Sequence, residues 1–218
     1  VAWAAGITSS SFANLLPDAD ESFKTLGITV QNHSYGTGIE NYYGVESFAY
    51  DVNCNNNPAL LHIFSAGNMG DQNGSETYAN VPFANLTGQF KMSKNTLSVG
   101  AVDSVGAIEP LSSKGPAYDG RVKPELVAYG GSGSSGAAAI VSGVALLLQQ
   151  IYQEKRGTIP PSALIKSVLI NSAEEVGLPG LDFESGYGNV HALRALETIE
   201  KGHFFERAVA EGAVQYFT

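Results

Sequence analysis

Short apolar runs alternate with longer stretches of helical periodicity through the middle of the chain. Residues 60–64 read Leu-Leu-His-Ile-Phe, and residues 96–102 repeat this pattern. Such runs, without regular polar alternation, are typical of strands covered on both faces in a parallel sheet. Shorter runs at 28–31 and 125–128 predict two further strands. The pattern therefore predicts a mostly parallel sheet.

The period changes after Gly136, where apolar residues recur at helical spacing. The apolar set is Ala137, Ile140, Val141, Val144, Ala145 and Leu148. It nearly encircles the helix, which predicts a buried helix. Further helices are predicted at 42–51, after Pro160-Pro161-Ser162, and at 191–201. Alternating strands and helices indicate a three-layer α/β domain.

Composition narrows the possible partners and cofactors. The 218 residues carry 21 Asp and Glu against 12 Lys and Arg, a net charge of −9. An acidic chain without a basic patch argues against a nucleic-acid partner. The single cysteine, Cys54, excludes an internal disulfide framework and a CxxC metal cluster. No acidic cluster has calcium-loop spacing, so we expect neither a metal nor a cofactor.

Two features concern targeting and membranes. The chain begins with Val1 and shows no signal-peptide pattern, so we expect a processed or shortened chain. The longest apolar run, residues 137–148, is interrupted by Ser142 and Gly143. It is shorter than the roughly 20 residues that cross a bilayer, so we expect no membrane insertion.

Residues 126–136 combine a strand, a turn of small residues and a helix N-terminus. Such a site offers free backbone N–H groups and the positive end of a helix dipole. Gly131, Gly133 and Gly136 spell the dinucleotide-binding fingerprint. The required acidic residue could be Glu154, but it lies at a helix end and another helix follows where a strand is needed. Dinucleotide binding is therefore a remote alternative.

A serine nucleophile is the second chemistry that such a turn supports. An anionic intermediate formed there would be stabilised by the serine N–H and the helix dipole. Ser134 or Ser135 could instead simply cap the helix, which is the commonest role of serine at this position. The spacing of the residues alone favours this capping role over that of a nucleophile.

Several segments together resemble the subtilisin-like serine peptidases, or subtilases. Residues 133–143 are similar to the family's nucleophile motif, and residues 65–68 to the segment that ends in its oxyanion-hole asparagine. Residues 32–36 resemble the strand that pairs with bound peptide. Further matches lie at 98–101, 112–116, 119–128 and 186–190. The matches occur in order over roughly residues 1–203.

The resemblance implies a three-layer subtilisin-like α/β fold and a secreted or cell-envelope serine endopeptidase. It implies Ser135 as nucleophile and Asn68 in the oxyanion hole. The substrate groove would be walled by Ser34, Tyr35 and Gly36 on one side and by Ser65, Ala66 and Gly67 on the other. The small second wall predicts a pocket open to a sizeable apolar side chain. The expected partner is a peptide or protein substrate.

Two small departures from the family motif lie at the helix start. Ala139 stands where the family usually has proline, and Ser134 replaces threonine. Neither departure removes a group that the reaction needs, although loss of the proline would loosen the first helical turn slightly.

The larger departure is the lack of the family's Asp and His-Gly motifs. A serine nucleophile needs a general base and a carboxylate that orients it. Residues 1–5 resemble the strand that follows the catalytic-histidine helix, so we expect a truncated domain over 1–205, inactive alone. Residues 206–218 are expected to form a closing strand or to begin a β-rich domain.

The remaining histidines and two carboxylates have sequence contexts that favour other roles. His33 and His62 lie within predicted strands and are expected in the interior, while His191 and His203 lie around the last helix. Asp119 and Glu125 fall where the family has structural residues. None of these six is assigned to the triad. The alternative function is a non-catalytic, peptide-binding subtilase-like domain.

Overall fold

A parallel four-stranded sheet forms the centre of the computed structural model, which describes residues 2–11, 13–207, 209–214 and 216. The strands are β1 (Val30–His33), β2 (Leu61–Ser65), β3 (Leu97–Val102) and β4 (Leu126–Tyr129), in the order β1-β2-β3-β4. Val30 aligns with Leu61, Ile63 with Leu97, and Val99 with Leu126. All residues of β2 and β3 are buried, which confirms the sequence prediction of strands covered on both faces.

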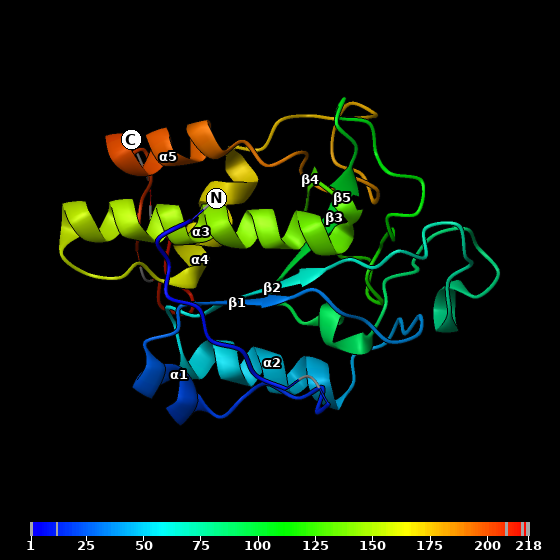
Figure 1. Cartoon of the computed structure of the whole chain (residues 1–218), viewed down its shortest axis with the longest axis horizontal. Coiled ribbons are helices and arrows are strands. Elements are labelled where there is room, and N and C mark those ends of the chain that lie inside the picture. Colours follow the sequence, from blue (N-terminus) through cyan, green and yellow to red (C-terminus); the bar gives the residue numbers. More distant parts are fainter. Residues whose placement is uncertain (1, 12, 208, 215, 217–218) are drawn as a thin grey trace.

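The long helix α3 (Ser134–Arg156) crosses the sheet and contacts all four strands (Figure 1). Its buried residues, among them Val141 and Leu148, pack on the sheet in the main hydrophobic core. Ser142 links it to β1, since its hydroxyl lies 3.2 Å from Asn32 Oδ1. The helix ends at Gly157, whose φ of 74° places it in the left-handed region that glycine readily adopts.

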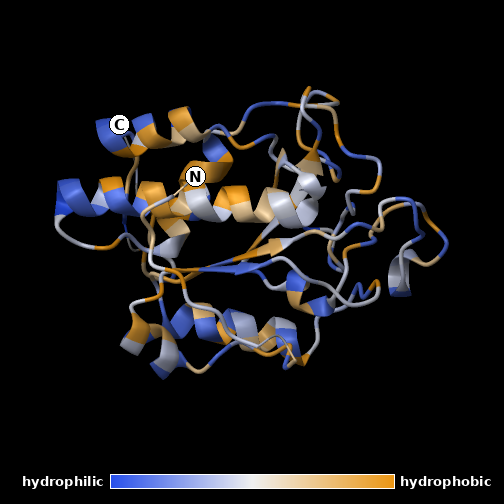
Figure 2. Ribbon diagram, in the orientation of Figure 1, coloured by the Kyte–Doolittle hydropathy of each residue, from blue (hydrophilic) through white to orange (hydrophobic). Residues whose placement is uncertain are grey.

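By length and composition alone, α3 could also cross a membrane. Half of its most apolar part is buried inside the domain, however. Figure 2 shows that its hydrophilic residues gather at the C-terminal end, beyond the part that lies over the sheet. This burial, and the contacts of α3 with all four strands, are typical of the central helix of a folded domain.

Helices cover both faces of the sheet (Figure 1). Beside α3 lie α4 (Ser162–Asn171) and α5 (Ala192–Lys201), and the opposite face carries α1 (Asp20–Leu26) and α2 (Val45–Asn56). On that face Tyr50 of α2 packs edge-on against Phe64 of β2, with ring centroids 5.0 Å apart. The three-layer prediction is confirmed. Two 3₁₀ turns, η1 (Glu76–Tyr78) and η2 (Gln89–Met92), and α1 were not predicted.

The glycine-rich turn contains a three-residue strand, β5 (Gly131–Gly133), directly before α3. After α3 the described chain continues into α4, and no strand follows. Glu154 is exposed near the end of α3. A dinucleotide fold needs a second parallel strand at this place. The reading of Gly131, Gly133 and Gly136 as a dinucleotide fingerprint is therefore wrong.

Both ends of the chain differ from their expected strands. Residues 2–11 form a turn and extended coil without a strand, and Trp3 and Ile7 are almost fully exposed. Within 202–207, 209–214 and 216 the structure likewise contains no strand. A strand needs a hydrogen-bonding partner, and neither segment finds one among the described residues. Residues 1, 208, 215, 217 and 218, which belong to these two predictions, lie outside the described residues.

Candidate active site

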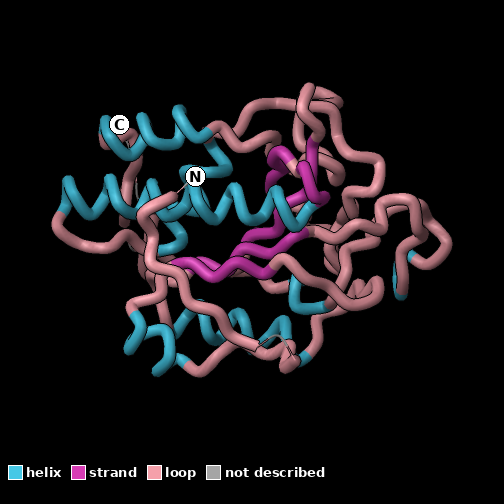
Figure 3. The backbone as a smooth tube through the Cα atoms, viewed as in Figure 1, coloured by secondary structure: helices cyan, strands magenta, loops and turns pink. Residues whose placement is uncertain are grey.

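The ends of β1 and β2 meet the start of α3 on the side of the molecule where loops predominate (Figure 3). Ser34 follows β1 directly, and Ser135 is the second residue of α3. The Ser34 hydroxyl donates to the Ser135 carbonyl at 2.9 Å, and Ser135 Oγ lies 3.4 Å from the Ser34 carbonyl. Two segments that are 101 residues apart are thus joined at this edge.

Asn68 is held against the first residue of α3. Its Oδ1 accepts from the Ser134 N–H at 3.0 Å and lies 2.9 Å from Ser134 Oγ. The Ser134 hydroxyl also lies 3.0 Å from the Gly67 carbonyl and accepts from the Gly67 N–H at 3.1 Å. Because Oδ1 is engaged, the amide N–H groups of Asn68 are the donors left to a ligand.

The helix start adds further donors at the same point. The N-cap is Gly133, with φ 71°, and no side chain caps the helix. Neither serine is therefore a helix cap. The first-turn N–H groups of a helix have no helical acceptor, and the dipole is positive there. The first turn contains no acidic residue, so the environment of Ser135 favours a developing negative charge.

The expected groove walls come together, but they differ in exposure. Ser34 and Gly36 are exposed, whereas Ser65, Ala66 and Gly67 are buried. Tyr35 turns its hydroxyl inward, 3.0 Å from His33 Nδ1. Only part of the expected set can therefore contact a ligand with its side chains.

A third segment of the chain packs against both walls of the expected groove. A Cβ placed on Gly67 would lie 2.5 Å from Thr87 Oγ1, and one placed on Gly36 would also overlap Thr87. Thr87 therefore occupies the space between these two glycines. The sequence prediction of room for a sizeable apolar side chain considered the walls without this third segment, and it stays a prediction.

His33 and His62 belong to a buried hydrogen-bonded chain. Asn53 Nδ2 donates to Asp20 at 2.6 Å, so Asn53 Oδ1 accepts from His62 Nε2 at 2.7 Å. His62 Nδ1 then accepts from His33 Nε2 at 2.9 Å, and His33 Nδ1 accepts from Tyr35. Each ring carries one proton in this arrangement, and both are neutral. Neither ring reaches Ser135, as expected for interior histidines.

The other candidates for acid–base roles are also engaged elsewhere. His191 accepts from the Arg194 N–H at the start of α5, and His203 is exposed after that helix. Asp119 pairs with Arg121 at 2.8 Å. Among the described residues, the Ser34 carbonyl is the hydrogen-bond partner of the Ser135 hydroxyl, and no histidine or carboxylate takes that place.

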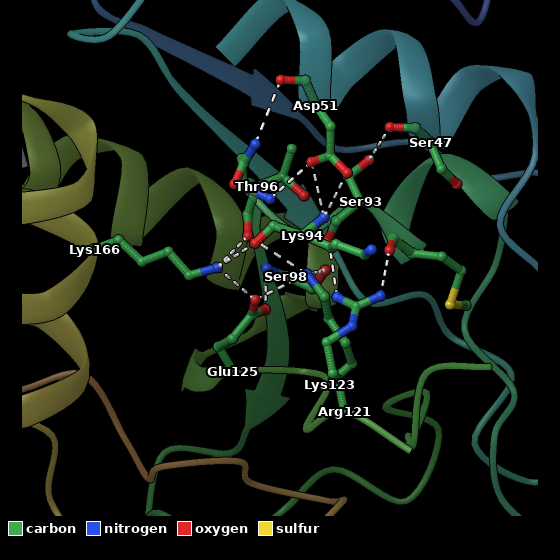
Figure 4. Close-up of polar contacts among 12 residues, drawn as sticks. Ser47, Asp51, Ser93, Lys94, Thr96, Ser98, Arg121, Lys123, Glu125 and Lys166 are labelled. Carbon is green, nitrogen blue, oxygen red and sulfur yellow. Dashed lines mark hydrogen bonds and ion pairs between the residues drawn. The ribbon is translucent and has the colours of Figure 1, made fainter. Parts of the chain in front are cut away.

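Glu125 is the centre of a buried ion-pair cluster (Figure 4). Its Oε1 lies 2.8 Å from Lys123 Nζ and 2.9 Å from Lys166 Nζ, while Oε2 accepts from the Ser98 N–H at 2.7 Å. Burial alone would raise the pKa of this carboxyl, but the two ammonium groups hold it below the ordinary value. The cluster ties the strand β4 to β3 and α4, which is the structural role expected for Glu125.

This arrangement of parallel sheet, helix-borne serine and adjacent asparagine is that of a serine peptidase domain of the subtilisin type. The model of the subtilase family matches residues 5–188, and the chain belongs to this family.

Two groups of known proteins are similar to this chain. The membrane-bound transcription factor site-1 protease of Mus musculus is 34% identical over 126 residues, which is 48% of this chain and 12% of that protein. The subtilisin-like protease SBT6.1 of Arabidopsis thaliana is 30% identical over 130 residues, 50% of this chain and 12% of that protein. The chain thus matches only about an eighth of the length of these curated relatives.

Solved structures share the fold over most of the chain. The patellamide maturation protease PatA has a TM-score of 0.65 at 25% identity, covering 84% of this chain and 66% of that one. The prenylagaramide maturation protease PagA has a TM-score of 0.64 at 26% identity, covering 83% and 66%. The chain therefore accounts for about two thirds of each of these protease structures.

Proposed function

We propose that the parent protein is a serine endopeptidase in which Ser135 is the nucleophile. The observation that carries this proposal is the position of Ser135 on the first turn of α3, beside the fixed amide of Asn68. Ser135 Oγ attacks the carbonyl carbon of the scissile peptide bond. The Ser135 N–H and Asn68 Nδ2 bind the resulting oxyanion, the amine leaves, and water releases the acyl group.

The general base and its orienting carboxylate come, in this proposal, from outside residues 1–218. Two features support it: the described residues bring no histidine to Ser135, and β1 pairs with β2 alone. A strand added along the open edge of β1 would end beside Ser34 and Ser135. Residues 1–205 would then be part of a larger catalytic domain, and 206–218 would begin whatever follows it.

The substrates and the localisation that we propose for the parent protein follow from its membership of the subtilase family. Its substrates are peptides or proteins, and it acts outside the cytoplasm, secreted or in the cell envelope. It uses no nucleic acid and no cofactor. We propose no membrane insertion through α3, because that helix supplies the core beneath the sheet.

An active-site probe tests the nucleophile directly. The full-length protein should be labelled by a fluorophosphonate at Ser135, and Ser135→Ala should abolish the labelling. Ser104→Ala, at an exposed position away from the site, is a matched control that keeps the nucleophile. Absence of labelling in a protein with an intact melting transition would contradict catalysis and favour the peptide-binding alternative.

The isolated chain provides a second test. Residues 1–218 alone should hydrolyse a peptide ester negligibly, because loss of the histidine of a serine triad costs a factor of about 10⁶ in kcat. That magnitude was measured on subtilisin, a member of the same family. Hydrolysis by residues 1–218 that Ser135→Ala abolishes would show that an outside base is not needed.

A further inference from the structure

Thr87 is tied to both walls of the candidate groove. Its N–H donates to the Ala66 carbonyl at 3.2 Å, and the next residue, Gly88, donates to the Gly38 carbonyl at 2.9 Å. Its side chain lies against the positions of a Cβ on Gly36 and on Gly67, and only 4% of Thr87 is exposed. Thr87 therefore forms the floor of the space between the walls.

A buried lysine lies directly behind this floor. Lys91, on η2, has no exposed surface, and its Nζ donates to Thr87 Oγ1 at 2.7 Å and to the Ala66 carbonyl at 3.4 Å. None of the ion pairs among the described residues includes it. Burial lowers the pKa of this ammonium to about 7. A buried cation without a carboxylate partner is costly, and a nearby anion would compensate that cost.

The direction of the hydrogen bond between Lys91 and Thr87 determines which group Thr87 can offer to a ligand. An ammonium has only donors, so Thr87 Oγ1 is the acceptor of the bond with Lys91. The hydroxyl proton of Thr87 then remains available to an acceptor in the groove. A hydroxyl donor supported by an unpaired positive charge is complementary to a carboxylate oxygen.

We propose that Thr87 and Lys91 determine specificity by selecting a short side chain with an acceptor oxygen, aspartate above all, for the residue before the scissile bond. The inference rests on the proposed function and specifies its substrate class. Because Thr87 lies against the Cβ positions of both Gly36 and Gly67, the proposed pocket is shallow and suits a short side chain better than phenylalanine or leucine. The charge of Lys91 acts through the hydroxyl of Thr87, so Lys91 is a positioning residue.

The test uses the full-length protein and peptidyl diphenyl phosphonates that differ only at this residue: Asp, Asn, Ala or Phe. The rate of labelling at Ser135 reports the preference. The wild type should react at least about tenfold faster with Asp than with Asn, and about tenfold faster with Ala than with Phe. A fluorophosphonate without a side chain measures the nucleophile independently of the pocket.

Three variants separate the effect of the pocket shape on substrate preference from the effect of the Lys91 charge. Thr87→Gly should open the floor and raise the Phe/Ala ratio about tenfold. Thr87→Val keeps the shape, so Phe should stay rejected while the Asp/Ala ratio falls towards one. Lys91→Met should lower the Asp/Asn ratio. Thr25→Val, at an exposed position of α1, is the matched control and should leave every ratio unchanged.

The outcomes distinguish this inference from the function on which it rests. A wild type that prefers Phe, or a folded Thr87→Gly variant with unchanged ratios, would overturn the pocket assignment even if fluorophosphonate labels Ser135. A folded wild type that fluorophosphonate does not label would overturn both. Because the ratios compare substrates within one variant, partial loss of folded protein does not affect them.

Discussion

Asn68 Oδ1 accepts the backbone N–H of Ser134 at 3.0 Å and lies 2.9 Å from the hydroxyl of the same residue. These two contacts with one residue fix the rotation of the amide. The amide N–H groups are consequently oriented before any ligand binds, which avoids reorganisation when negative charge develops.

Replacing Asn68 by alanine should therefore slow the labelling of Ser135 in the full-length protein. Loss of one oxyanion donor costs a factor of about 10²–10³ in rate, a range measured on subtilisin, a relative within this family. Asn55→Ala, at an exposed position of α2, should have no effect. Equal labelling rates for the two variants would exclude Asn68 from the oxyanion hole.

Gly133 provides a backbone test of the same site. Its φ is 71°, and an added Cβ would lie 2.8 Å from Asn68 Oδ1. With ψ −164° the residue lies in a region that is essentially restricted to glycine, so Gly133→Ala should cost about 1–3 kcal/mol in backbone strain. It should also displace Asn68, which should slow labelling at least about tenfold. Gly157, with φ 74°, has no atom near an added Cβ. Gly157→Ala should thus lower the melting temperature without changing the labelling rate.

Glu125→Gln should strongly destabilise the fold. The change leaves Lys123 and Lys166 without their carboxylate in a buried site, and breaking a buried pair costs about 3–5 kcal/mol of unfolding free energy. The partly exposed pair Lys114–Glu184 is the control, and Glu184→Gln should cost about 0–1 kcal/mol. Urea denaturation measures both. Similar losses for the two variants would contradict a buried cluster.

Stability should fall in mildly acidic solution because of the two interior histidines. Burial lowers the pKa of His62 to about 3 and that of His33 well below its ordinary 6.5. As the pH falls, these two histidines therefore bind protons in the unfolded chain before they do so in the folded chain. The stabilisation is complete above pH 6.5 and is lost as pH falls towards 3, by up to about 1.4 kcal/mol per pH unit for each ring.

The corresponding experiment compares the unfolding free energy at several pH values between 7.5 and about 5. His62→Gln should have a shallower pH dependence than the wild type, whatever its stability at neutral pH. His203→Gln, which changes an exposed ring, should retain the wild-type slope. Parallel curves for the wild type and His62→Gln would show that the buried pair does not cause the acid sensitivity.

Much of the fold could be predicted because its signals are local. The mostly apolar run before Ser65 and the helical spacing after Gly136 each indicate an element by themselves, and the structure confirms both. Helix α1 was missed because its seven residues bury only Phe23, too little to give a periodic pattern.

The floor of the groove could not be predicted in the same way. Gly36, Gly67 and Thr87 lie in three separate segments, and only the folded chain brings them together. Lys91 left one signal, a charged residue between the apolar Phe90 and Met92. Such a position suggests a buried lysine, but the sequence does not show what lies opposite its ammonium group.

Helix α3 both presents Ser135 and contacts every strand of the sheet. Its central amides cannot exchange with solvent by opening of the helix alone, since that would expose the main core. We expect them to exchange only through global unfolding, at the slowest rate in the chain. The reactive hydroxyl is thus attached to the most persistent element of the domain, and its position should stay fixed until the whole domain melts.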